Sequence, residues 1–276
     1  MGKTSSLSFS LRLALLLLLC LGKAAAQGTI IGDTTLSQKE IDRIIAAFTT
    51  KETQFRLALN QYSFKRDATI QSLGMGGQVT GEYRRVSYFT FDDNGNRFEK
   101  ISFFPMPSFN QVTPEDLDDL GGIQPFALEP SKLDKYNIKY VGKEQIDELN
   151  LYVFDVTPKV IPDPNKTKER LFVGRVWVDD QDLQIVKTRG KGVPETKINK
   201  FPIVETYREQ IGRYWFPTYS YTDEELVFDN GTSLHVRMRV KYSDFVPARA
   251  TLTITEIAGP DAPDKPKPEQ TPPNKP

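Results

Sequence analysis

The chain has 276 residues, of which 36 are Lys or Arg, 36 are Asp or Glu, one is His and one is Cys. A net charge of zero excludes a strongly basic nucleic-acid binder. The scarcity of His and Cys excludes most zinc centres, Cys–His nucleophiles and Ser–His–Asp triads, because each of these sites needs one or both residue types. We therefore expect no catalytic, metal-binding or cofactor-binding residues, and no cofactor.

The first 26 residues have the features of a secretory signal peptide. Lys3 and Arg12 precede an apolar run over Leu13–Leu21, and three alanines ending at Ala26 follow it. The run is too short for a membrane-spanning helix, which needs about 20 apolar residues. We predict export with cleavage after Ala26. Cleavage removes three basic residues and no acidic one, so the mature chain has 33 basic and 36 acidic residues and a net charge of −3.

The only cysteine, Cys20, lies inside the apolar run of the signal peptide. A bacterial lipoprotein carries its lipidated cysteine at the end of such a segment, directly after a small residue. Leu19 stands in that position here, so we favour a soluble exported protein over a lipid-anchored one. After cleavage the chain has no cysteine, and we expect no disulfide although the compartment would permit one.

Residues from about 37 to 60 are predicted to form one amphipathic helix. Ser37 and Glu40 have the spacing of a capping box at its start. Apolar residues such as Ile44 and Phe48 then recur at helical spacing along one face. This apolar face must pack on another part of the molecule.

Most of the chain after this helix is predicted to be β-strand, because Tyr, Phe, Val and Thr are abundant and Asn-Gly turns interrupt the pattern. Only one further helix is signalled, by Thr113 as its N-cap and Pro114 at its first position. A single strongly curved antiparallel sheet accommodates these strands most economically, which gives a mainly β (α+β) fold. The predicted strands lie near 62–73, 79–92, 96–104, 135–143, 149–157, 169–179, 182–189, 202–211, 213–222, 224–229, 232–243 and 251–257.

The last 18 residues, 259–276, contain seven prolines and no aromatic or branched aliphatic residue. Such a segment buries too little apolar surface to offset the entropy of ordering it. We predict three parts of the chain: the signal peptide at 1–26, one folded domain at 27–258, and a disordered Pro-rich tail at 259–276.

Two groups of polar residues are candidates for chemistry, and each has a simpler explanation. His235 lies among the polar residues of an alternating strand, as an exposed surface histidine would. The acidic run from Asp179 to Asp182 could bind calcium, but it lacks the glycine and distal glutamate of a calcium loop, and Asp is common in turns. A carboxylate-based hydrolase is therefore an unfavoured alternative.

The aromatic residues point to a cavity. Of the 30 aromatic residues, 29 lie between Phe48 and Phe245, spread over nearly every predicted strand. A curved sheet with so few helices has more inward apolar surface than one or two helices can cover. We therefore predict an open or partly filled apolar cavity on its inward face.

The sequence resembles the LolA-like superfamily of envelope proteins, which includes outer-membrane lipoprotein-sorting carriers and the lipid-sensing domain of MucB/RseB-type regulators. A hairpin carries the resemblance: Gly174-Arg175-Val176-Trp177-Val178-Asp179 followed by Leu183-Gln184-Ile185-Val186-Lys187. It implies a half-open barrel of antiparallel strands, with the N-terminal helix and one or two short helices as a lid over bound acyl chains. The functional arginine of the true carrier has no position here that we can match.

The favoured function is that of a non-enzymatic periplasmic protein that shelters the acyl chains of a lipid or lipoprotein and carries them through the periplasm. We expect a monomer that binds no nucleic acid. The alternative is an interaction or regulatory module that senses lipids or binds an envelope protein. The candidate ligand-cavity residues are Phe48, Phe89, Trp177, Val236, Met238 and Val240.

Overall fold

The computed structural model describes residues 29–31, 35–108, 128–167, 169–197 and 199–248. Several predicted segments lie outside the described residues: the signal peptide, the short helix beginning at Thr113, the strand at 251–257 and the Pro-rich tail. These segments, and the domain boundaries that they define, remain predictions.

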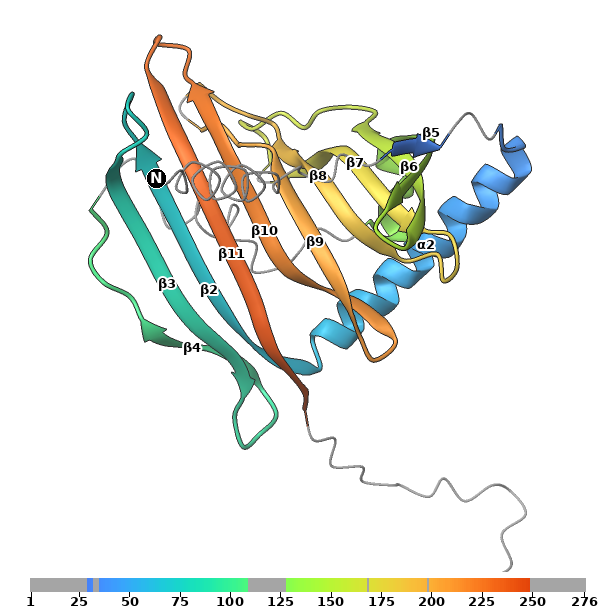
Figure 1. Cartoon of the computed structure of the whole chain (residues 1–276), viewed down its shortest axis with the longest axis horizontal. Helices are drawn as coiled ribbons and strands as arrows, with labels where there is room; N and C mark the ends of the chain where they lie inside the picture. Colours follow the sequence, from blue (N-terminus) through green and yellow to red (C-terminus); the bar gives the residue numbers. More distant parts are fainter. Residues whose placement is uncertain (1–28, 32–34, 109–127, 168, 198, 249–276) are drawn as a thin grey trace, which may run out of the picture.

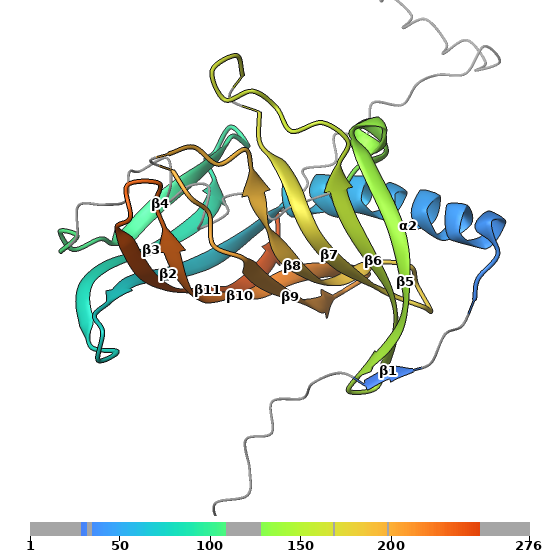
Figure 2. The same ribbon diagram turned by 90° about the horizontal axis from the view of Figure 1, so that it is seen from above.

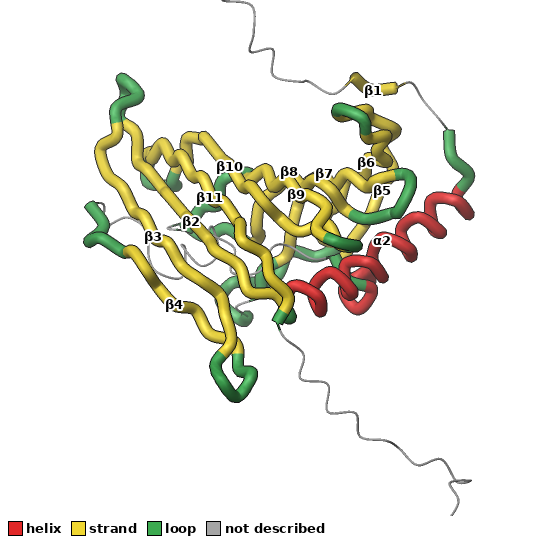
Figure 3. Tube along the Cα trace, turned by 60° about the horizontal axis from the view of Figure 1, so that its bottom comes forward, coloured by secondary structure: helices red, strands yellow, loops and turns green. Residues whose placement is uncertain are grey.

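Helix α2 (Gln38–Leu59) confirms the predicted amphipathic helix. It begins at the expected place, because the backbone N–H of Glu40 donates a hydrogen bond of 3.3 Å to the Ser37 Oγ. The Glu40 carboxylate binds Arg43 on the next turn, with hydrogen bonds of 2.7 and 3.0 Å. Figure 3 shows this single long helix beside a sheet that makes up most of the molecule. Among the described residues, no helix is long and apolar enough to cross a membrane.

All the described strands belong to one antiparallel sheet, in the order β1-β5-β6-β7-β8-β9-β10-β11-β2-β3-β4. The sheet is strongly curved and is not closed into a barrel, so β1 and β4 are its two edges (Figure 1). The predicted fold class is therefore confirmed. The strands are β1 (Thr29–Ile31), β2 (Tyr62–Leu73), β3 (Val79–Phe91), β4 (Arg97–Phe103), β5 (Tyr136–Ile146), β6 (Leu149–Pro158), β7 (Leu171–Asp179), β8 (Ile185–Val193), β9 (Val204–Ile211), β10 (Tyr214–Val227) and β11 (Ser233–Pro247).

One predicted break in the sheet is wrong. The sequence predicts separate strands at 213–222 and 224–229, but β10 runs through Asp223 without a break. The reason lies on the neighbouring strand β11, where His235 and Arg237 bind the Asp223 carboxylate at 2.6 and 2.9 Å. Paired across the sheet, Asp223 supports the strand in place of ending it.

Three smaller differences concern segments with weak sequence signals. β8 begins at Ile185, later than predicted, because residues 180–182 form the turn before it. The edge strand β1 and the short 3-10 helix η2 (Pro130–Lys135) were not predicted. Both elements are only a few residues long, so periodicity could not reveal them.

Helix α2 lies on the concave side of the sheet and crosses one flank of it (Figure 2). Near the start of α2, Ile44 and Phe48 are fully buried in a cluster with Phe154, and the Phe48 and Phe154 rings lie 5.5 Å apart. Near its end, Phe55 packs with Phe216 at a ring distance of 6.0 Å. The two apolar clusters therefore fix both halves of the helix.

A buried ion pair joins the middle of α2 to β9. Arg208 donates two hydrogen bonds to the Glu52 carboxylate, of 2.6 and 3.0 Å, and the two side chains are only 2% and 1% exposed. The guanidinium also lies 4.3 Å from the centre of the Phe55 ring. Burial raises the pKa of the Glu52 carboxyl, and the charge of Arg208 opposes that rise.

Two glycines allow an aromatic ring to pack directly against the backbone of β7 and β8 on the concave face. Gly174 and Gly190 are paired in register, and the Phe172 ring lies over them. A Cβ atom on Gly190 would come within 2.5 Å of the Phe172 ring and would also meet the backbone oxygen of Val173. On Gly192, two residues further along the same strand, the nearest atom to such a Cβ would be a ring carbon of Phe201 at 3.8 Å.

We predict that Gly190→Ala lowers the free energy of unfolding by about 1–3 kcal/mol, because the added methyl group overlaps a ring and a backbone oxygen. Gly192→Ala is the matched control and should change this free energy by much less, since its methyl group makes only ordinary contacts. Urea denaturation followed by tryptophan fluorescence measures both variants. Equal losses in the two variants would contradict the close approach at Gly190.

We predict that Arg208→Met lowers the free energy of unfolding by about 3–5 kcal/mol at pH 7, because it leaves the Glu52 carboxylate buried without its partner. The loss should shrink as the pH falls through and below about 4.3, the ordinary pKa of a glutamate, because the carboxyl then becomes protonated in the unfolded state as well as in the folded variant. Urea denaturation at several pH values tests this expectation. The double variant Glu52→Leu/Arg208→Met should recover much of the stability and lose the pH dependence.

Candidate functional site

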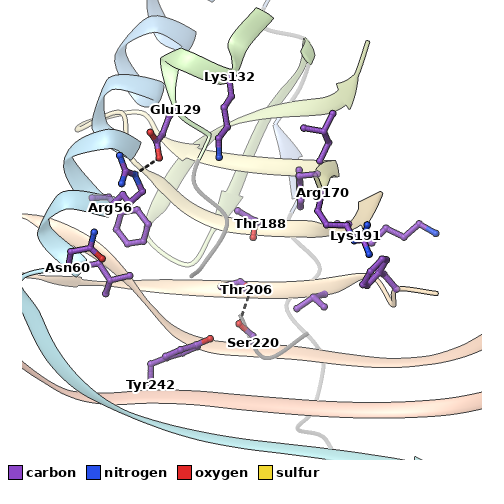
Figure 4. A pocket seen from close by; sticks show the side chains of 18 of the residues that line it. Arg56, Asn60, Glu129, Lys132, Arg170, Thr188, Lys191, Thr206, Ser220 and Tyr242 are labelled. Atoms are coloured by element: carbon purple, nitrogen blue, oxygen red, sulfur yellow. Dashed lines mark hydrogen bonds and ion pairs between the residues drawn. The ribbon is translucent and has the colours of Figure 1, made fainter. Parts of the chain in front are cut away.

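A cavity of about 650 Å³ lies on the concave face, between the C-terminal half of α2 and the sheet. Its volume is within the range of about 300–1,000 Å³ that is common for small-molecule sites. Figure 4 shows the cavity with α2 and η2 along one side and the strands of the sheet across from them. The lining residues are Phe55, Arg56, Leu59, Asn60, Phe89, Arg97, Phe98, Glu99, Glu129, Lys132, Tyr136, Glu169, Arg170, Leu171, Phe172, Thr188, Gly190, Lys191, Gly192, Phe201, Pro202, Val204, Thr206, Ser220 and Tyr242.

The apolar part of the lining combines the helix with strands from both halves of the sheet. Phe55 and Leu59 come from the apolar face of α2, Phe89 from β3, and Phe172 from β7. Phe201 contributes another ring from the segment before β9. Because these elements are far apart in the sequence, the cavity exists only once the sheet has curved around the helix.

The lining contains many polar and charged side chains, more than a purely apolar cavity would have. The Arg56 guanidinium forms an ion pair with Glu129, and the Thr206 and Ser220 hydroxyls share a hydrogen bond of 2.9 Å (Figure 4). The Lys132 side chain extends from η2 toward the cavity in the same view. Burial raises the pKa of Tyr242 to about 12, so its phenol is neutral at physiological pH.

Three carboxylates line the cavity, and a cation holds each of them. Arg66 and Arg85 bind Glu99, at 3.1 and 2.5 Å. The other two, Glu129 and Glu169, are paired with Arg56 and Lys135. Every described carboxylate of the lining therefore has a cationic partner.

The six residues that the sequence singles out as a candidate ligand cavity lie in different parts of the structure. Phe89 lines the cavity. Phe48 belongs to the first half of α2 and packs against Phe154, and Val236, Met238 and Val240 lie on β11 in the cluster that contains Phe55. Trp177 belongs to a separate cluster on the convex face, and its indole N–H donates a hydrogen bond of 2.7 Å to Glu144. Trp177 faces away because Val176 and Val178, its neighbours on β7, face the helix.

Sequence reasoning missed the polar residues of the cavity. A signal was present in the strands, because the inward positions of β8, β9 and β10 carry Thr188, Thr206 and Ser220 where a fully packed core would carry larger apolar residues. The arginines could not be found in this way. Arg97 comes from β4 and is half-buried, and this burial lowers the pKa of its guanidinium.

The other candidate polar groups lie away from the cavity. His235 is paired with Asp223 and has a side chain that is 41% exposed, in line with the surface position expected for it. The acidic run after β7 forms the predicted turn, in which Asp179 accepts backbone hydrogen bonds from Gln181 and Asp182. The described residues contain no cluster of three or more His, Cys, Asp or Glu side chains suited to hold a metal ion.

No protein-family model matches this sequence, and neither does any curated protein. Solved structures do match it. The chain is similar to a DUF1329 family protein from Desulfovibrio piger, with 15% identity and a TM-score of 0.38 over 75% of this chain and 93% of that chain. A LolA superfamily protein from Nitrosomonas europaea has 14% identity and a TM-score of 0.30, over 72% and 94% of the two chains.

MucB is a third similar structure, with 11% identity and a TM-score of 0.24 over 74% of this chain and 92% of that chain. A further structure shows MucB in complex with MucA(peri). LolA superfamily proteins and MucB are also proteins that the sequence resembles. Because each of these TM-scores is below 0.5, we derive the function of this chain from its own residues.

Proposed function

We propose that this protein is an exported, non-enzymatic binding protein that holds an acyl chain of a lipid or lipoprotein in the cavity on its concave face. One observation carries the proposal: an open, strongly curved sheet and the helices α2 and η2 enclose a cavity of about 650 Å³ with many apolar residues in its lining. The predicted signal peptide supports a periplasmic location, where lipids and lipoproteins must cross an aqueous space.

The energy of binding comes from apolar surface. Transfer of an acyl chain from water into an apolar site contributes about 0.8 kcal/mol for each buried CH₂ group. Phe55, Leu59 and Phe172 offer such a surface without any reactive group. The cavity stays unfilled because Phe48 and the Glu52–Arg208 pair hold α2 over one flank of the sheet. These features account for binding and assign no chemical step to the protein.

We predict that the protein, exported with its own leader in a bacterial host, carries lipid when it is purified from the periplasm. Native mass spectrometry should show an added mass that organic extraction removes. Gly192→Leu should reduce the bound lipid, because its side chain would enter the cavity without overlapping the backbone. Gly192→Ala is the control, since its methyl group occupies little of the cavity.

Two results would count against acyl binding. The first is a purified protein without lipid that also fails to take up an added fluorescent fatty acid. The second is uptake that Gly192→Leu leaves unchanged, which would place the lipid outside this cavity.

A second candidate function, binding to an envelope protein, is supported by the edge strand β4. β4 pairs only with β3 in the described sheet, so its other edge offers unpaired backbone groups. Large apolar side chains on and after it are about half exposed, including Ile101 at 47% and Phe103 at 48%. A partner strand could extend the sheet at this edge.

We predict that Ile101→Lys weakens any such complex, because a lysine on an edge strand opposes the addition of another strand. Val79→Lys, on a residue of β3 that is 50% exposed, is the matched control. Chemical crosslinking in intact cells, followed by mass spectrometry, compares the two variants with the wild type. A crosslinked partner that all three proteins retain equally would exclude the β4 edge as the binding surface.

A further inference from the structure

Three arginines and one glutamate lie on the inward side of the β2–β3–β4 edge of the sheet, where it meets the cavity. Arg66 on β2 and Arg85 on β3 both bind Glu99 on β4, at 3.1 and 2.5 Å. Arg97, also on β4, donates from its Nη1 to the backbone oxygen of Leu59 at 3.1 Å, which places it beside the end of α2. We call Arg66, Arg85, Arg97 and Glu99 the arginine corner. It has three positive charges and one negative charge.

Several buried polar atoms in and beside the arginine corner have no hydrogen-bond partner among the described residues. The Arg66 side chain is only 4% exposed, yet its Nε and Nη1 atoms have no hydrogen-bond partner among the described residues. The same holds for the Arg97 Nε and for the Oγ of Ser87, which is paired with Arg66 in register and is fully buried. A buried donor without an acceptor costs about 1–3 kcal/mol, and more when it is charged. These atoms therefore indicate an acceptor that the described chain does not provide.

The arginine corner opens on the cavity. Arg97 and Glu99 both line it, and Arg66 lies directly behind them, paired in register with the lining residue Tyr242. The Phe89 ring, another lining residue, lies under two guanidinium groups, 5.0 Å from Arg66 and 5.6 Å from Arg97. A ligand in the cavity would meet an aromatic surface and a surplus of positive charge at the same place.

The lining of the cavity as a whole carries a net positive charge, like the arginine corner. Five cationic side chains line the cavity against three acidic ones, although the full chain has no net charge. The acidic side chains are paired with cations, and two of the five cations, Arg56 and Lys191, are paired with Glu129 and Glu195. Arg97 and Lys132 have no carboxylate partner among the described residues. The lining therefore favours an anionic ligand over a neutral or cationic one.

We propose that the arginine corner binds a phosphate group, as the headgroup of an amphiphile whose acyl chain lies in the cavity. Guanidinium groups match the oxygens of a phosphate in pairs, and the donors left open on Arg66 and Arg97 are of this kind. The proposal rests on the acyl-binding function, and it adds that the ligand is anionic. A free phosphate ion has the same chemistry and is distinguished by the test.

Binding of three probes to the purified full-length exported protein tests the proposal: lysophosphatidic acid, a monoacylglycerol with the same palmitoyl chain, and inorganic phosphate. Isothermal titration calorimetry at low salt should give at least a tenfold higher affinity for lysophosphatidic acid than for the monoacylglycerol. Arg97→Gln should remove about tenfold of the affinity for lysophosphatidic acid and leave the monoacylglycerol unaffected. Arg84→Gln is the matched control, because Arg84 pairs with Asp67 on the opposite face of the sheet.

Ser87→Ala provides a second variant that should fold, because the Ser87 hydroxyl has no hydrogen-bond partner among the described residues. It should weaken lysophosphatidic acid binding by about threefold without lowering the thermal midpoint. Equal affinities of the wild type for the two lipids would overturn the phosphate site and leave acyl binding intact. Inorganic phosphate that binds as tightly as lysophosphatidic acid would overturn the headgroup assignment. Failure of both lipids to bind would overturn the proposed function itself.

Discussion

The architecture depends on how one helix is held against a much larger curved sheet. An eleven-stranded sheet presents a long concave face, and α2 is the only α-helix among the described elements. Phe48 and Phe55 attach the two halves of α2, and the Glu52–Arg208 pair lies between them. A buried pair adds little net stability, but it is highly directional. Together these contacts define which part of the concave face the helix covers and which part it leaves for a cavity.

Much of the fold could be predicted because the signals for it are local. Ser37 marks the start of α2, and the alternation of side chains marks most strands to within a few residues. The prediction failed at Asp223, where a charged residue is stabilised by His235 and Arg237 on the next strand. That information is not local, since the pairing partners are more than ten residues away.

The site was less predictable than the fold for the same reason. Of the residues that the sequence singles out, Phe89 lies in the lining of the cavity, whereas Trp177 faces the other side of the sheet. Its orientation follows from the register of β7, which a hydrophobic run on both faces does not reveal. The arginines were missed because each lies among other charged residues of its own strand, and nothing in the strand itself marks it as part of a site. Arg66 and Arg97 become one feature only when β2, β3 and β4 pair.

The polar residues of the lining limit which ligands the cavity can bind well. An entirely apolar cavity would favour any acyl chain alike, since the hydrophobic effect is not directional. Specificity has to come from a few placed polar groups, and buried donors discriminate strongly because a ligand that cannot satisfy them leaves them unpaired. Arg66 and Arg97 are such donors, at the edge of an aromatic surface. In the proposed complex, the apolar residues supply the affinity for an acyl chain, and the arginine corner selects the chains that carry a phosphate headgroup.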